Sequence, residues 1–149
     1  MDELDRVDRN IIAALGRDGR LSMADLAEKV GLSKTPVQAR VRRLERDGFI
    51  KGYQAVIDRA KMGEGHIAFV QVKLSDTTSA ALDAFNKAVL NVREIEQCHM
   101  MAASFDYLLK VRTTDIAAYR RALGEKIAAL PHVAQTSTFV VMETVRDRA

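Results

Sequence analysis

A run of basic side chains between residues 34 and 51 forms a local positive block in a nearly balanced chain, which suggests a surface that binds a polyanion. The run holds six basic and two acidic residues, whereas residues 1–28 hold four basic and seven acidic residues. In a helix, Val37, Val41 and Leu44 would recur at i, i+4 and i+7 and face the core. The opposite face would then present Arg beside amide and small side chains, and Arg and Gln pair with guanine, adenine or phosphate in the major groove. We therefore expect DNA contacts from Ser33, Lys34, Thr35, Gln38, Ala39, Arg42, Arg43 and Arg46.

The elements that must position this basic face also favour DNA binding. Charge alone leaves an ordinary solvated helix face open as an alternative. Residues 1–48, however, carry apolar stripes with the spacing of three short helices. Ser22 is placed to cap the second helix, and Ser33 or Thr35 the third. Only three or four residues, Gly31 among them, join these two helices, which is the helix-turn-helix arrangement.

The second half of the chain repeats one pattern of strand, helix and strand. Apolar runs and alternations predict strands, and stripes such as Leu82, Phe85 and Val89 predict helices. The βαββαβ order is the split βαβ, or ferredoxin-like, plan, in which both helices cover one sheet face. The chain is therefore expected to be an α+β protein. The predicted elements are a strand at 66–75, a helix at 78–90, strands at 92–102 and 105–113, a helix at 115–130 and a strand at 132–145.

A connecting segment separates the two halves. Residues 49–57 are rich in β-forming side chains and are expected to form a strand that leaves the helical domain. Residues 58–65 are polar and contain glycine, as linkers do. The expected organisation is a helix-turn-helix domain at 1–50, a connecting strand and linker at 51–65, and a second domain at 66–149.

One face of the predicted sheet has no helix to cover it. Alternation in the last strand places Phe139 and Val141 on one face and Val140 and Met142 on the other. Because neither face is polar throughout, the uncovered face must pack against another chain or a ligand. We expect a homodimer, which would also let two recognition helices read a two-fold operator.

Several classes of protein are excluded by what the sequence lacks. Cys98 is the sole cysteine, which excludes an internal disulfide framework and a multi-Cys zinc site, and the three histidines show no ligand spacing. No apolar run approaches the roughly 20 residues of a membrane span, and the acidic N-terminus is no secretory signal. We expect a cytoplasmic protein without a membrane partner. No nucleotide-binding or nucleophile motif is present, so we expect no catalytic residues, no metal and no cofactor.

Short motifs in one register are spread over nearly the whole chain. They include Leu4-Asp5-Arg6-Val7-Asp8-Arg9, Val30-Gly31-Leu32-Ser33, Gly48-Phe49-Ile50-Lys51-Gly52-Tyr53, Phe105-Asp106-Tyr107-Leu108-Leu109-Lys110-Val111 and Leu130-Pro131-His132-Val133. Together these motifs resemble the leucine-responsive regulatory protein/AsnC family of prokaryotic transcription regulators. Each motif alone would be weak, but their combination is specific.

The resemblance implies a winged-type helix-turn-helix domain followed by an effector-binding and oligomerisation domain. It also implies a sequence-specific regulator of transcription, with double-stranded DNA and a small effector, typically an amino acid, as partners. Dimers of the family assemble further, often to octamers. The effector residues that the resemblance assigns here are Met101, Ala102, Ala103, Ser104, Asp106, Thr136 and Thr138. Ala103 stands where the family usually has glycine.

An amino acid needs acceptors for its ammonium group and donors for its carboxylate. Asp106 would hold the ammonium, and backbone N–H groups of residues 102–105 with the hydroxyls of Thr136 or Thr138 would hold the carboxylate. Two alternatives without a ligand remain. Asp106 could simply bond the backbone of its own turn, as Asp often does. Thr136 and Thr138 could be ordinary strand residues, because Thr is common in strands. At the level of the whole protein, an architectural DNA organiser without an effector is the alternative that Ala103 suggests. An enzyme is a weaker one, because no acid, base and nucleophile converge.

Overall fold

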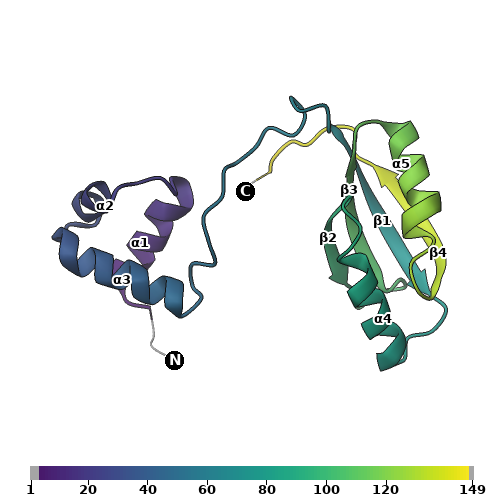
Figure 1. The fold of residues 1–149 in the computed structure, drawn as a ribbon, viewed down its shortest axis with the longest axis horizontal. Coiled ribbons are helices and arrows are strands. Elements are labelled where there is room, and N and C mark those ends of the chain that lie inside the picture. Colours follow the sequence, from purple (N-terminus) through teal and green to yellow (C-terminus); the bar gives the residue numbers. More distant parts are fainter. Residues whose placement is uncertain (1–3, 148–149) are drawn as a thin grey trace. The chain divides into compact units, whose positions relative to one another are not determined.

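The computed structural model describes residues 4–147, and the chain divides into two compact units between Val56 and Ile57. This division lies inside the segment predicted to connect the two domains. Figure 1 shows helices alone in the first unit, and a sheet with helices in the second. Among the described residues, no helix is both long enough and apolar enough to cross a membrane.

The first unit consists of α1 (Arg6–Arg17), α2 (Met23–Val30) and α3 (Lys34–Arg46). The side chain of Ser22 accepts from the N–H of Asp25 at 3.0 Å and caps α2, as predicted. Gly31 ends α2 with a φ of 73°, a left-handed conformation that glycine adopts without steric cost. The tight turn at Gly31 brings α3 against the other two helices.

The apolar stripe predicted for the third helix forms the core of this unit. Val37, Val41 and Leu44 are each at most 4% exposed and pack with Ile11 of α1 and Leu26 of α2. Because these three positions face inward, the opposite face of α3 is left for solvent or a partner. The prediction for this helix is confirmed.

The predicted strand at 49–57 is wrong, because residues 51–58 have no regular secondary structure. Val56 and Ile57 are 80% and 51% exposed. A strand requires a hydrogen-bonded neighbour, and β-forming side chains cannot supply one. Within the described chain, the sheet contains no strand from this segment.

The second unit has the predicted βαββαβ order. Its four strands form one antiparallel sheet in the order β2-β3-β1-β4, which is the ferredoxin-like arrangement. The long helix predicted at 115–130 is an α-helix that continues as a π-helical turn. The elements are β1 (His66–Leu74), α4 (Ser79–Val89), β2 (Ile95–Met100), β3 (Tyr107–Thr113), α5 (Ile116–Ala122), the π-turn η1 (Leu123–Ile127) and β4 (Val133–Val140).

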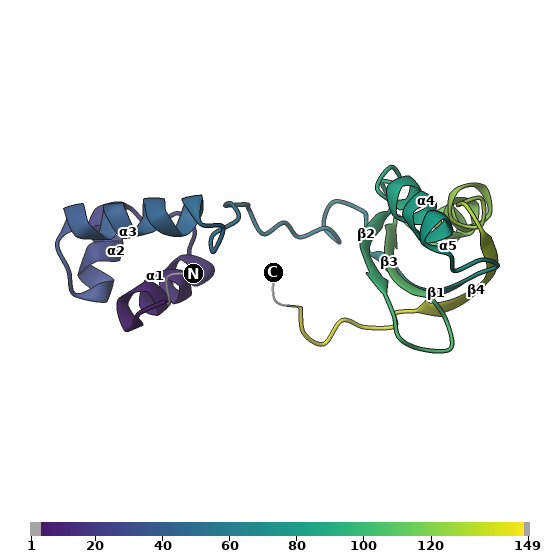
Figure 2. The same cartoon turned by 90° about the horizontal axis from the view of Figure 1, so that it is seen from below.

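The two helices cover the same face of the sheet, and the other face is bare (Figure 2). On the covered face, Val70, Val72 and Leu109 of the sheet are fully buried against Phe85 of α4. Ile116, at the first turn of α5, is 58% exposed and does not belong to this core.

The bare face carries apolar side chains at its centre. Phe69 of β1 lies directly opposite Phe139 of β4, and Phe139 is 53% exposed. Leu108 of β3 lies opposite Gln71 on the same face. No helix or strand of the described residues 4–147 covers this aromatic pair and leucine, in agreement with the expected uncovered face.

Candidate DNA-recognition helix and effector-binding loop

The exposed face of α3 presents the residues predicted to contact DNA. Thr35, Ala39, Arg42 and Arg46 are all exposed, and Gln38 is part-buried beside them. Ala39 is small enough to let a base edge approach closely. The geometry matches a recognition helix, with an amide and guanidinium groups on the side opposite its core positions.

The first turn of α3 also suits a phosphate group. Ser33 is its N-cap, but within the described structure the Ser33 side chain makes no capping hydrogen bond. Lys34 and Thr35 follow in the first turn and are exposed. Backbone N–H groups at a helix N-terminus bind anions, so the exposure of Ser33, Lys34 and Thr35 is compatible with the contacts predicted for them.

Arg43 differs from the other predicted contact residues because its guanidinium turns toward α1. Its Nη2 atom lies 2.6 Å from Oδ2 of Asp8, whose side chain is 1% exposed. Arg40, which sequence reasoning did not assign to the site, donates to Oδ1 of Asp8 at 2.8 Å and to Oδ2 of Asp5 at 2.6 Å. Burial by itself raises the pKa of Asp8, but the two arginines outweigh it and hold that pKa below its usual range.

Asp106, the predicted ammonium ligand, closes the end of the sheet. Its Oδ2 atom accepts the Leu74 N–H at 2.7 Å, and its own N–H donates to the Val72 carbonyl at 2.9 Å. The Met101 N–H donates to the Asp106 carbonyl at 2.8 Å, which closes the loop. Oδ2 of Asp106 is thus used by the backbone, whereas Oδ1 accepts no hydrogen bond from the described residues.

The loop itself is open to solvent and has no strained alanine. Residues 101–104 are all exposed. In the part of the chain that the structure describes, His132 is the only non-glycine residue with a positive φ, at 63°. Ala103 therefore has a negative φ, so the loop takes a shape that does not require glycine at this position.

The two predicted threonines lie on the helix-covered face of β4. Thr136 and Tyr107 flank Val72 in the two neighbouring strands, so Thr136 and the effector loop meet at the same end of the sheet. One strand separates them, which corresponds to about 10 Å. The hydroxyl of Thr138 forms a short hydrogen bond with the Tyr119 hydroxyl of α5. Thr136 therefore lies nearer the loop than Thr138, whose hydroxyl is already engaged.

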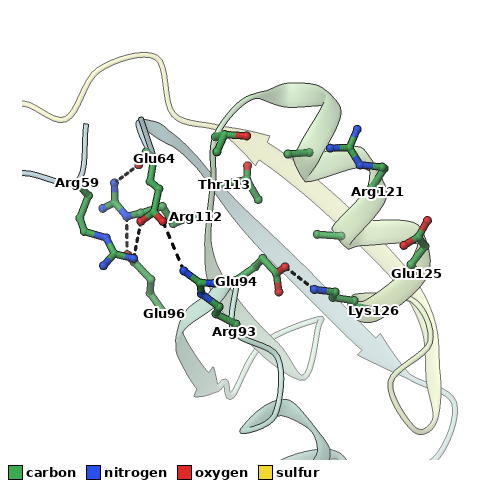
Figure 3. A pocket seen from close by; sticks show the side chains of 13 residues that line it. Arg59, Glu64, Arg93, Glu94, Glu96, Arg112, Thr113, Arg121, Glu125 and Lys126 are labelled. Atoms are coloured by element: carbon green, nitrogen blue, oxygen red, sulfur yellow. Dashed lines mark hydrogen bonds and ion pairs between the residues drawn. The ribbon is translucent and has the colours of Figure 1, made fainter. Parts of the chain in front are cut away.

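A charged cavity of about 310 Å³ lies at the opposite end of β3 (Figure 3). Glu64 lies at one side of the cavity (Figure 3). Its Oε2 atom is 2.6 Å from Nη2 of Arg59, and its carbonyl accepts from Arg112 at 3.0 Å. Across the cavity, Lys126 pairs with Glu94 at 2.5 Å. None of the described residues that line it is a predicted effector residue. Its charges largely satisfy one another and fasten the segment before β1 to the sheet.

Comparison with known proteins decides the family. A model of the Lrp/AsnC ligand binding domain matches residues 67–149. A model of a winged helix-turn-helix DNA-binding domain matches residues 4–51. The chain belongs to the Lrp/AsnC family.

Members of the family resemble the chain over nearly its whole length. A proline dehydrogenase transcriptional activator of Rhizobium radiobacter is 56% identical over 146 residues, 98% of this chain and 94% of the relative. A protein of the same name from Rhodobacter capsulatus is 51% identical over 147 residues, 99% of this chain and 96% of the relative. The crystal structure of a Neisseria meningitidis transcriptional regulator in complex with L-Met superposes with a TM-score of 0.92, at 26% identity and covering 98% and 94% of the two chains.

The family match confirms the fold and the functional class. An Lrp/AsnC protein is a transcription regulator in which a winged helix-turn-helix domain binds DNA and a separate domain binds a small ligand. The chain is therefore a DNA-binding transcription regulator with a ligand-binding domain, and not an enzyme. The individual contact residues remain predictions.

Proposed function

We propose that this Lrp/AsnC regulator activates transcription of a gene for a proline-degrading enzyme and that proline is its effector. The observation that carries the proposal is the similarity, at 56% and 51% identity over nearly the full length, to two proline dehydrogenase transcriptional activators. A substrate that induces its own degradation is a natural effector for such an activator.

The DNA-reading part of the proposal rests on the exposed face of α3. Gln38 and Arg42 reach base edges, with Ala39 allowing close approach, and Arg46 and Lys34 neutralise phosphates. Ser33 and Thr35 add hydrogen bonds to the backbone at the N-terminus of the helix.

The effector part of the proposal rests on Asp106 and the exposed loop that it closes. The secondary ammonium of proline has two N–H donors, and one of them pairs with Asp106 Oδ1 because Oδ2 already holds the Leu74 N–H. The carboxylate accepts from backbone N–H groups of residues 102–105 and from the Thr136 hydroxyl. Thr138 contributes through its bond to Tyr119 rather than directly.

The oligomeric part of the proposal follows from two exposed surfaces. The bare sheet face with Phe69, Leu108 and Phe139 packs against the same face of a second chain, giving a two-fold dimer. Because residues 101–104 are exposed in one chain, a neighbouring dimer closes the effector site. Dimers thereby assemble into an octamer whose DNA-binding units change their spacing when the effector binds. We place this assembly in the cytoplasm, where bacterial DNA lies.

The test combines calorimetry with DNA binding. Titration of proline into the full chain should release heat, and a promoter duplex from a proline dehydrogenase gene should be shifted in a proline-dependent manner. Linkage requires that the duplex change the affinity for proline by the same factor as proline changes the affinity for the duplex. Heat from another amino acid alone would replace proline as the effector. DNA binding without heat from any amino acid would support the architectural organiser instead.

A further inference from the structure

A buried carboxylate on α1 holds two of the five basic side chains of α3. Asp8 has a side chain that is 1% exposed, with Arg40 Nη1 at 2.8 Å from Oδ1 and Arg43 Nη2 at 2.6 Å from Oδ2. Asp5 adds a second acceptor for Arg40 at 2.6 Å. All four residues belong to the DNA-binding unit.

The carboxylate is itself held in place by the start of α1. The Asp8 N–H donates to Oδ1 of Asp5 at 2.8 Å, and the Asp5 N–H donates to Oδ2 of Asp8 at 3.2 Å, which is a reciprocal capping box. Asp8 therefore cannot follow its arginines if they move. A phosphate could recruit either arginine only by leaving part of a buried charge unpaired, which is strongly unfavourable.

The positions along α3 divide its basic residues into two groups. Arg40 and Arg43 are one helical turn apart, so they lie on the same flank, and both are only about 30% exposed at the side chain. Arg42 is exposed and has no place in the Asp8 cluster. The structure thus distinguishes neighbouring arginines that the sequence presents as equivalent.

We propose that Asp8 is a specificity-determining residue of the DNA-binding unit, because it withholds Arg40 and Arg43 from the phosphate backbone. The proposal rests on the proposed role of α3 as the recognition helix, and it removes Arg43 from the predicted contacts. Phosphate contacts raise affinity for every sequence equally. Keeping two cations off the backbone limits non-specific binding, while residues such as Gln38 and Arg42 still read bases.

The salt dependence of DNA binding separates the two groups of arginines. Binding of the full chain to a random-sequence duplex is measured by fluorescence anisotropy over a series of salt concentrations. Each lost phosphate contact flattens the slope of log K against log[salt] by about 0.9. On a random-sequence duplex Arg42 has no selected base to read and contacts phosphate instead, because phosphate contacts supply essentially all non-specific binding. We therefore expect this flattening for Arg42→Gln and an unchanged slope for Arg43→Gln, its matched neighbour. An Arg43→Gln slope as flat as that of Arg42→Gln would overturn the proposal.

The second variant releases the arginines instead of removing them. Asp8→Asn keeps an acceptor for the Asp5 N–H but loses the charge that holds Arg40 and Arg43. We expect a slope steeper by about 0.9–1.8, for one or two new phosphate contacts, and a lower ratio of affinities for a selected and a random duplex. The selected duplex is obtained with the wild-type chain from a random library. Asp8→Glu should restore both quantities toward wild type.

A purely structural role for Asp8 gives a different pattern. In that case Asp8→Asn lowers the affinity for both duplexes by the same factor and leaves the slope of log K against log[salt] unchanged. This result would overturn the proposal. If Asp8→Asn does not fold, the comparison of Arg42→Gln with Arg43→Gln still decides, because Arg43→Gln keeps the Arg40–Asp8 pair. Failure of the proposed function looks different again, since the wild-type chain would then bind neither duplex at low salt.

Discussion

Replacing Asp106 by alanine should weaken the sensor unit even before any effector is present. The Leu74 N–H at the end of β1 donates to Asp106 Oδ2 at 2.7 Å. Leaving a buried N–H without a partner costs about 1–3 kcal/mol. Because Asp106 is part-buried and water reaches part of this end of the sheet, we expect the lower half of that range. For a unit of about 90 residues, each kcal/mol lowers the melting temperature by about 4–8 °C.

Asp106→Asn is the matched control, because its amide oxygen can still accept the Leu74 N–H. A neutral acceptor gives a weaker bond than a carboxylate, so the loss should be smaller than for alanine. Neither variant can pair with the ammonium of proline through a charge. Thermal unfolding with and without proline therefore separates the bond to Leu74 from the bond to proline. Asp106→Ala should lose both stability and the proline-induced shift, whereas Asp106→Asn should lose mainly the shift.

The size of the response sets the precision that the assay needs. Proline at 100 times its dissociation constant should stabilise the wild-type chain by roughly 2.7 kcal/mol. A full proline shift in Asp106→Asn would refute the assignment of Asp106 as the ammonium ligand. An Asp106→Ala chain that melts with the wild type would refute the account of the Leu74 bond.

Three further perturbations test other parts of the structure. On the bare sheet face, Phe139→Glu should break the dimers from which the octamer is built and lower the sedimenting mass, whereas Leu90→Glu, at the end of α4, should leave that mass unchanged; an unchanged mass for Phe139→Glu would exclude this face as the interface. The lowered pKa of Asp8 means that its contribution to stability is present above the ordinary carboxyl value of 3.8 and is lost as pH falls through the folded value. The free energy of unfolding of the DNA-binding unit, measured with urea, should therefore fall below pH 3.8 in the wild type and in Asp25→Asn, but much less in Asp8→Asn. An equal loss in all three chains would contradict the pairing of Asp8 with the arginines. Glu64→Gln should free the segment before β1 and speed its cleavage by trypsin without lowering the unfolding temperature of the sensor unit, and an unchanged cleavage rate would show that the Glu64 contacts do not restrain it.

The sequence was sufficient to predict features that depend on a single helix or strand, because the spacing of apolar residues shows which side of that element is buried. Val37, Val41 and Leu44 mark the buried side of α3 by spacing alone, and all three are buried. The order of strands and helices in the second unit is likewise visible as changes of period. In both cases the pattern reflects contacts that a single amphipathic element must make.

The sequence was insufficient where a feature depends on two distant elements or on a second chain. Residues 49–57 have the side chains of a strand, but pairing needs a neighbour that the described chain does not provide. Asp8 is one of several acidic residues in an acidic segment, and the sequence of its helix does not predict that its side chain is buried. The matching spacing, Asp5 and Asp8 against Arg40 and Arg43, was a usable signal, because both pairs are separated by three residues.

These pairs also change the meaning of the uneven charge along the chain. From the sequence, the acidic first segment and the basic third helix look like two independent surfaces, of which the second binds DNA. In the structure, two acidic residues of the first segment pair with two arginines of the third helix. The charge offered to DNA is therefore smaller than the basic run suggests. It resides mainly on Lys34 and Arg42, because Arg46 also pairs with Asp47 at 2.8 Å. Phosphate attraction grows with every available cation, whereas discrimination depends on base contacts. This arrangement benefits a regulator that must dissociate quickly from random DNA sequence. The paired arginines stabilise the packing of its recognition helix without raising its affinity for non-specific DNA.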